Sequence, residues 1–354
     1  MGDMEEIIEH KVEDQTCSIE NYEARCWGCG LQLVLPYFAP VFKCGWCGAI
    51  TVHRLQSSRR CFNYGVLRDR FLVVIVFAVI LLFIGGGVWA IFPITFPGLS
   101  FSFFIHSFIA AILSFNTLIN YCLAVLIPAG HPPHIAWGRV DLVGKGSLDG
   151  HRYCDFCKSP KPPQAHHCRT CSACVVDMDH HCPFIGNRVG ASNRQHFILF
   201  LFFTVLSTLY ILLMSIYTGC IIWPHLLEIR HEQSYSAFIR LQTSSSFVST
   251  LIKLFMSGHI FLSARAHTLA YLIVASLSVG IGVGLLLYQQ LLSIYSGQTY
   301  LDSLQISHGI IQDLTVTGGW DNFRKVFGNS HFIFWMLPKP IRWHDAFGRK
   351  YHFK

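Results

Sequence analysis

The chain has 354 residues, of which 52% are hydrophobic and only 13% charged, and its mean hydropathy is +0.42. This composition is too apolar for an ordinary soluble domain and predicts an α-helical polytopic membrane protein. The formal net charge is +7. No base-reading element accompanies that charge, so we expect anionic membrane lipid as its partner and no nucleic acid.

The first 20 residues are acidic and lack the apolar core of a signal peptide. Residues 21–55 then carry two C-x2-C pairs separated by fourteen residues, Cys26 with Cys29 and Cys44 with Cys47. Two such pairs present four thiolates to one tetrahedral zinc ion, and the glycines after each pair suit tight turns. The segment therefore predicts a zinc ribbon. A structural prop is the simpler interpretation, and a surface that recruits a partner protein is the alternative.

Four apolar runs without Lys, Arg, Asp or Glu are long enough to cross a bilayer. They cover residues 71–96, 101–130, 197–224 and 267–295. A cluster of basic residues precedes the first run, which predicts a cytosolic N-terminus, a cytosolic segment 131–196 and a cytosolic tail 296–354. Residues 225–266 would then face the lumen or the exterior, with an interfacial stretch at 247–262. The sequence leaves open whether the protein resides in an endomembrane (Golgi or ER) or in the plasma membrane.

Segment 131–196 holds a second cysteine cluster, which is too short and too polar to be stabilised by burial alone. Four of its residues have the spacing of one tetrahedral zinc site: Cys154, Cys157, His167 and Cys174. A second site would begin with Cys168, Cys171 and a histidine from position 180 or 181. Cytosolic reducing conditions favour such metal ligation over disulfides.

Cys182 is the one cysteine of this cluster that these two zinc sites do not use. It lies two residues after His180, which follows Asp179. A carboxylate that orients an imidazole, which in turn lowers the pKa of a thiol, produces a nucleophilic thiolate. The alternative is that Cys182 is the eighth ligand of two closed zinc sites.

The sequence "DHHC" at 179–182, preceded by "HCRTCSAC" and placed between the second and third of four spans, resembles the DHHC protein S-acyltransferases (palmitoyltransferases). The segment "RCWGCG…KCGWCGAIT" is also similar to a ribbon found in some plant members. The resemblance implies that Cys182 takes an acyl group from acyl-CoA, with His180 as base and Asp179 as its orienting partner. It further implies one zinc on Cys154, Cys157, His167 and Cys174, and another on Cys168, Cys171, His181 and a cysteine six residues after Cys182. The acyl acceptors would be protein substrates with juxtamembrane cysteines.

The chain departs from this family at several positions. Arg188 stands where the last zinc-ligand cysteine is expected, so the second site would keep three protein ligands and water, recruit another donor or stay empty. Gln164 replaces a frequent arginine, which leaves CoA phosphate contacts to Lys161, His166 and Arg169. After the fourth span, "TYLD" resembles the family's Thr-Thr-x-Glu motif, with Thr299 kept, Tyr300 for the second threonine and Asp302 for the acid. In the tail, "NFRKVFG" resembles the family's C-terminal motif, in which Asn322 would hydrogen-bond within the domain.

Three functions remain after these observations. The first is a protein S-acyltransferase that loads Cys182 from acyl-CoA. The second, favoured by Arg188, is a catalytically weak, zinc-held membrane scaffold for client proteins. A channel or transporter is poorly supported, because the spans carry no charged residue that would mark an ion path.

Overall fold

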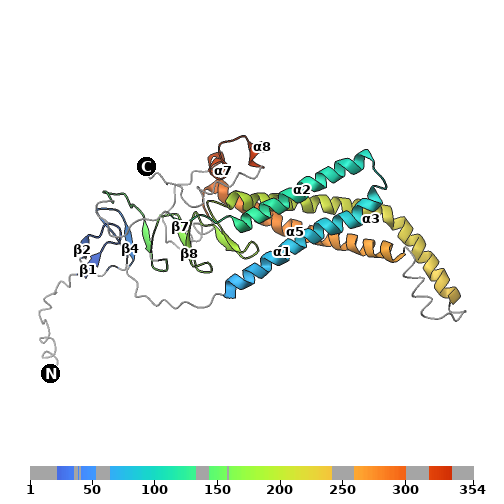
Figure 1. The fold of residues 1–354 in the computed structure, drawn as a ribbon, viewed down its shortest axis with the longest axis horizontal. Coiled ribbons are helices and arrows are strands. Elements are labelled where there is room, and N and C mark those ends of the chain that lie inside the picture. Colours follow the sequence, from blue (N-terminus) through green and yellow to red (C-terminus); the bar gives the residue numbers. More distant parts are fainter. Residues whose placement is uncertain are drawn as a thin grey trace, which may run out of the picture. The chain divides into compact units, whose positions relative to one another are not determined.

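A computed structural model describes residues 22–35, 39, 41–52, 64–132, 143–157, 159–240, 259–299 and 319–336. The acidic N-terminal tail, most of the predicted interfacial stretch 247–262, and Tyr300 and Asp302 of "TYLD" lie outside the described residues. The chain divides into two compact units (Figure 1). The first comprises residues 1–60, 133–163 and 351–354, and the second comprises residues 61–132 and 164–350.

The first unit is built from six short strands. These are β1 (Tyr22–Arg25), β2 (Gln32–Leu35), β3 (Val41–Lys43), β4 (Ile50–Val52), β5 (Arg152–Cys154) and β6 (Ser159–Lys161). The first two form an antiparallel hairpin, and the other four form one sheet in the order β3-β4-β5-β6. Strands β4 and β5 run parallel, with Ile50 opposite Arg152.

This pairing differs from the expected division of the chain. Residues 21–55 and 131–196 were predicted to be separate domains, but β4 and β5 join the ribbon to the start of the second segment. A small ribbon has little apolar surface of its own. Leu148, from the second segment, supplies part of the missing core by packing among the buried ribbon cysteines and Trp27. The indole Nε1 of Trp27 also donates to the carbonyl of Ile50 at 3.0 Å.

The second unit contains helices α1 (Tyr64–Thr95), α2 (Phe101–Leu126), α3 (Arg194–Arg240), α5 (His259–Ser296), α7 (Trp320–Phe327) and α8 (Phe332–Trp335). Four of them are long and apolar enough to cross a membrane: Tyr64–Thr95, Phe101–Leu126, Arg194–Pro224 and Ala264–Ser296. The prediction of a polytopic membrane fold with four spanning helices is therefore confirmed.

The helix ends differ from the predicted spans at several positions, and α5, for example, begins at His259 instead of residue 267. Helix α1 begins at Tyr64, so it includes the charged residues Arg68 and Asp69, which precede the apolar run. Helix α3 continues past Pro224 to Arg240, so the start of the predicted loop 225–266 is helical.

Helix α3 packs against both α2 and α5 and forms the centre of the bundle (Figure 1). At one end of the bundle, α7 covers the helices with Phe327, which is buried against Ile198 and Ile294. Asn322 is buried as expected, and its Nδ2 donates to the carbonyl of Tyr295 at 3.2 Å.

Two hairpins complete the second unit: β7 (Ala165–Cys168) with β8 (Ala173–Val176), and β9 (His180–Cys182) with β10 (Asn187–Val189). The second hairpin is tied to the C-terminal end of α2. There Asn187 Nδ2 lies 3.1 Å from the carbonyl oxygen of Ala124 and 2.8 Å from that of Ile127. These carbonyls have no partner within a helix, so the asparagine both caps α2 and fixes the hairpin that carries residues 180–182.

Candidate functional site

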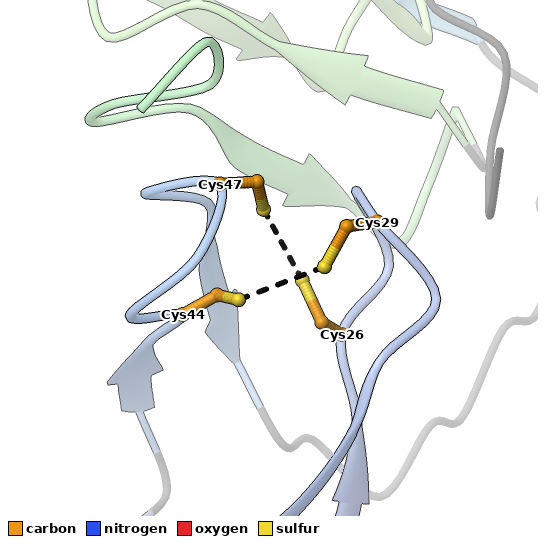
Figure 2. Close-up of side chains that lie close together, drawn as sticks. All are labelled: Cys26, Cys29, Cys44 and Cys47. Atoms are coloured by element: carbon orange, nitrogen blue, oxygen red, sulfur yellow. Dashed lines mark hydrogen bonds between the residues drawn. The ribbon is translucent and has the colours of Figure 1, made fainter. Parts of the chain in front are cut away.

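The four ribbon cysteines converge at one point (Figure 2). The Sγ atoms of Cys26 and Cys47 lie 3.6 Å apart, and those of Cys29 and Cys44 lie 3.7 Å apart. Tetrahedral zinc with bonds of about 2.3 Å requires sulfur separations of about 3.8 Å. All four side chains are buried. The donor set therefore fits a structural zinc ion closed to water.

The two halves of this ribbon repeat the same local structure. Gly30 N donates to Cys26 O, and Gly48 N donates to Cys44 O, each at 3.0 Å. Both glycines have a positive backbone φ, 77° for Gly30 and 79° for Gly48. Residues other than glycine rarely adopt this conformation. The glycines after each C-x2-C pair thus close the turns, as the sequence predicted.

The first predicted zinc site of the second cluster is divided between the two units. Cys154 and Cys157 belong to the first unit, and His167 and Cys174 belong to the second. Within the second unit, His167 lies opposite Cys174 in the β7–β8 hairpin, with Nδ1 3.9 Å from Sγ. The four-residue ligand set stays a prediction.

The second predicted zinc site lies entirely in the second unit. The Nδ1 atom of His181 is 3.7 Å from Sγ of Cys168 and 3.4 Å from Sγ of Cys171. Zinc bound by one imidazole and two thiolates would hold these atoms about 3.5 Å apart. A hydrogen bond with Cys171, assisted by one with His181, outweighs burial and lowers the pKa of Cys168 to about 4, which favours the ligating thiolate.

The surroundings of this second site include two charged residues. On one side, Nε2 of His181 donates to Oδ2 of Asp69 over 2.7 Å, and Arg68 binds the other carboxylate oxygen. On the other side, Arg188 lies directly opposite His181 in the β9–β10 hairpin. The Nε and Nη1 atoms of Arg188 are buried and have no hydrogen-bond acceptor among the described residues.

Asp179, His180 and Cys182 form a continuous chain of interactions. Nδ1 of His180 donates to Oδ2 of Asp179 over 2.7 Å, and the Cys182 thiol interacts electrostatically with the same imidazole. Burial lowers the pKa of His180, but the interactions with Asp179 and Cys182 outweigh it and raise the pKa to about 9. The imidazole therefore favours the charged form that stabilises a neighbouring thiolate.

Asp179 is fully buried and is held by residues from two helices. Gln290 of α5 donates from Nε2 to Oδ2 over 2.9 Å, and Nη2 of Arg194 at the start of α3 lies 3.8 Å from Oδ1. A buried carboxylate is costly unless donors and a positive charge compensate it. These contacts supply that compensation and fix the orientation of Asp179.

An apolar cavity lies among the four long helices. Its wall on α1 runs from Val79 to Phe92, about 20 Å along the helix axis. Ile80 belongs to this wall and also packs against the buried cluster that contains Cys182. Ile80 therefore lies between the cavity and the buried cluster that contains Cys182. Several hydroxyls of the cavity wall have partners within the protein, for example in the 3.1 Å bond between Thr117 and Ser207.

The predicted CoA contacts are also divided between the units. Lys161 lies on β6 in the first unit, whereas His166 on β7 and the exposed Arg169 belong to the second. This binding set stays a prediction.

Sequence reasoning missed several residues next to the candidate site, among them Asp69, Gln290 and Arg194. Asp69 lies between two arginines just before an apolar run, where it resembles an ordinary juxtamembrane charge. Gln290 follows Gln289 inside an otherwise apolar span. Polar residues within a span usually face the bundle interior and mark function, and this signal was available for Gln290.

Comparison with known proteins agrees with this site. The DHHC palmitoyltransferase family matches residues 147–307. Probable protein S-acyltransferase 12 of Arabidopsis thaliana is 29% identical over 195 residues, covering 55% of this chain and 56% of that protein. Probable protein S-acyltransferase 13 of the same plant is 49% identical over 91 residues, 23% of this chain and 30% of the relative.

An animal relative, Palmitoyltransferase ZDHHC2 of Homo sapiens, is 50% identical over 60 residues, which is 17% of this chain and 16% of that protein. The chain thus spans less than two thirds of the length of each of these relatives. The segment matched by the family model includes the second cysteine cluster, Arg194 and Gln290, but neither the ribbon cysteines nor Asp69. The chain therefore carries a domain of the DHHC palmitoyltransferase family, which spans residues 147–307 and contains Asp179, His180 and Cys182.

Proposed function

We propose that the protein is a protein S-acyltransferase that moves a long-chain acyl group from acyl-CoA to Cys182 and then to a cysteine of a membrane-associated protein. The observation that carries this proposal is the hydrogen bond between His180 and buried Asp179, together with the interaction of the same imidazole with the Cys182 thiol. Carboxylate, imidazole and thiol in this order form an activated nucleophile.

In the first half-reaction, the Cys182 thiolate attacks the carbonyl carbon of the acyl-CoA thioester. The new carbon–sulfur bond forms as the bond to the CoA sulfur breaks, and protonated His180 gives its proton to the departing CoA thiolate. Asp179 stabilises the charged imidazole before that transfer and holds Nδ1 as the donor. Zinc, when bound, supplies structural order to the segments around this centre.

In the second half-reaction, neutral His180 takes the proton from the thiol of the acceptor protein. The acceptor thiolate then attacks the acyl group on Cys182, which leaves as a thiolate beside the imidazolium. One thioester replaces another at each step, so the protein's task is mainly positioning and thiolate activation.

The apolar cavity supports the choice of a long acyl chain. Each buried methylene contributes about 0.8 kcal/mol, so a wall about 20 Å long favours long chains over short ones. Because Ile80 contacts both the cavity and the Cys182 cluster, an acyl chain in the cavity would have its carbonyl end toward the thiol.

We further propose an arrangement in which both termini are cytosolic, in an endomembrane or the plasma membrane. The basic residues before the first span support this orientation. It places Cys182 at the cytosolic rim of the bundle, where acyl-CoA and juxtamembrane cysteines of client proteins are accessible.

An acyl-loading experiment tests the proposal. Purified full-length protein in nanodiscs is incubated with alkyne-labelled palmitoyl-CoA, and the label on the protein is measured before and after hydroxylamine. We expect a hydroxylamine-sensitive label on the wild type and none on Cys182→Ser. Equal label on both proteins would contradict the assignment of Cys182.

Arg188 favours the second function, a zinc-held scaffold that binds client proteins. Arg188 occupies the position expected for the fourth ligand of the second zinc site. This position lies two residues after the turn formed by residues 183–186. Absence of label on a monodisperse wild-type protein would support the scaffold and overturn the enzyme proposal.

A further inference from the structure

The orientation of His181 defines which of its nitrogen atoms is available to a metal ion. Nε2 donates to Asp69, so Nδ1 carries the free electron pair. That pair is directed toward the sulfurs of Cys168 and Cys171, at 3.7 and 3.4 Å. The three ligand atoms thus have the separations and the tautomer that zinc requires, although the site is one ligand short.

Arg188 makes this three-ligand site unfavourable for a cation. Arg188, which is positively charged, pairs directly with His181 across the β9–β10 hairpin. Asp69 carries the opposite charge and binds His181 from the other side. Asp69 is only 2% exposed, which keeps its charge poorly screened by water.

We propose that Asp69 is a positioning residue that allows Cys168, Cys171 and His181 to retain zinc without a fourth protein ligand. A carboxylate bound to the distal nitrogen of a histidine ligand fixes the ring and strengthens its ligand atom. Arg68 donates to Oδ1 of Asp69 from both Nε and Nη2, which leaves Oδ2 directed at His181. The first turns of α1 therefore become part of the metal site.

Metal content provides a test that does not depend on acyl transfer. Zinc is counted by mass spectrometry on the full chain in detergent, with Cys171→Ser as the reference that lacks the second site. We expect the wild type to hold one zinc equivalent more than Cys171→Ser. Equal zinc in the two proteins would overturn the proposal, whatever the outcome of the loading experiment.

The role of Asp69 is tested by the rate at which a chelator removes that equivalent. We expect Asp69→Asn to release it about tenfold to a hundredfold faster, the usual effect of removing a partner of a metal ligand. Asp321→Asn is the matched control, because its carboxylate is 83% exposed in the same unit. Equal release rates in the wild type and Asp69→Asn would refute the role.

A double variant separates a metal-site role from a general structural role of Asp69. Arg188→Cys supplies the missing thiolate, so we expect Asp69→Asn/Arg188→Cys to hold zinc at least as long as the wild type. A merely structural Asp69 would leave the double variant as unstable as Asp69→Asn. Should Asp69→Asn fail to fold, Arg188→Cys alone must still slow zinc release, and an unchanged rate would count against the proposal.

Discussion

Gln290 on α5 donates a hydrogen bond from Nε2 to Oδ2 of Asp179 over 2.9 Å, and both side chains are buried. The same carboxylate oxygen accepts Nδ1 of His180. Gln290 therefore acts on the imidazole through the aspartate, from a position 111 residues further along the chain.

Replacing Gln290 by leucine should slow the loading of Cys182. A hydrogen bond to a charged group contributes about 1.5–3 kcal/mol, so we expect roughly tenfold to hundredfold slower single-turnover acylation. The variant should still fold, because Arg194 and His180 continue to compensate the charge of Asp179. In addition, Oε1 of Gln290 is buried and has no donor among the described residues. Leucine removes that unsatisfied oxygen.

Gln289→Leu is the matched control for this prediction. Gln289 precedes Gln290 on the same helix, but its side chain is exposed on the outer face of the bundle. The control should load at the wild-type rate. Equal rates for the two leucine variants would show that Asp179 does not depend on Gln290.

The sequence alone predicted the elements with strong local patterns. Uncharged apolar runs predicted four spanning helices, and two C-x2-C pairs predicted the ribbon. The neighbours of the candidate site were not predictable in this way. Asp69 contacts His181 across 112 residues, and its burial depends on α1 beginning at Tyr64, before the apolar run starts. A periodicity of hydrophobic residues cannot show such an extension, because the added turns are polar.

Helix rotation was the second limit of sequence reasoning. Gln289 and Gln290 are chemically identical neighbours, and about 100° of rotation separates a residue on the lipid face from one that binds Asp179. Nearly uniform hydrophobicity on all sides of α5 removes the pattern that would fix its rotation. The parallel pairing of β4 with β5 was also not predictable from the sequence, because it joins short strands that lie about a hundred residues apart in the chain.

Substituting Gly87 should change the acyl chain that the protein prefers. Gly87 lines the cavity, and a Cβ added there meets no heavy atom of the described residues within 4 Å. Gly87→Leu would therefore fill part of the cavity, and its Cβ would meet no described atom within 4 Å. Excluding about two methylene groups removes about 1.6 kcal/mol of burial, so palmitoyl loading should fall roughly tenfold relative to loading with a shorter chain.

Gly85→Leu tests whether this effect comes from the cavity. Gly85 is exposed on the same helix, and a Cβ there also meets no described atom within 4 Å. The two variants have the same change in helix propensity, so only Gly87→Leu should alter the ratio of long-chain to short-chain loading. A shift of equal size in Gly85→Leu would exclude the cavity as its cause.

The pKa of His180 predicts how its contribution to stability depends on pH. The folded-state pKa of about 9 exceeds the ordinary value of about 6.5 for an unfolded chain. The ion pair with Asp179 therefore contributes its full stability below about pH 6.5, and this contribution is lost as pH rises to about 9. Thermal unfolding of the wild type and His180→Gln should show the largest difference in midpoint at pH 6 and the smallest at pH 9.

A constant difference between these two proteins across the pH range would contradict the raised pKa. Both proteins share all other titrating groups, so the effect of pH on those groups cancels in the difference between the two unfolding midpoints. His180 has a side chain that is 26% exposed, so solvent screening weakens the effect without removing it.

The shared core of the ribbon leads to the last prediction. Leu148 lies within the family-matched segment, yet it is 4% exposed and packs against the ribbon cysteines. Its Cδ1 atom would lie only 2.6 Å from a Cβ on Gly28, which shows how closely the two segments fit. Leu148→Ala would leave a cavity that costs about 2–5 kcal/mol, so the ribbon should open more often and release its zinc at least tenfold faster.

A chelator assay measures this release, and Cys47→Ser identifies which equivalent belongs to the ribbon. Val34→Ala serves as the control, because Val34 is apolar but 62% exposed in the same unit. If the ribbon were an independent domain, as its sequence suggests, Leu148→Ala would leave its zinc as tightly held as Val34→Ala does. Faster release from Leu148→Ala alone would instead show that the DHHC segment supplies part of the ribbon core, since the exposed valine contributes little to packing.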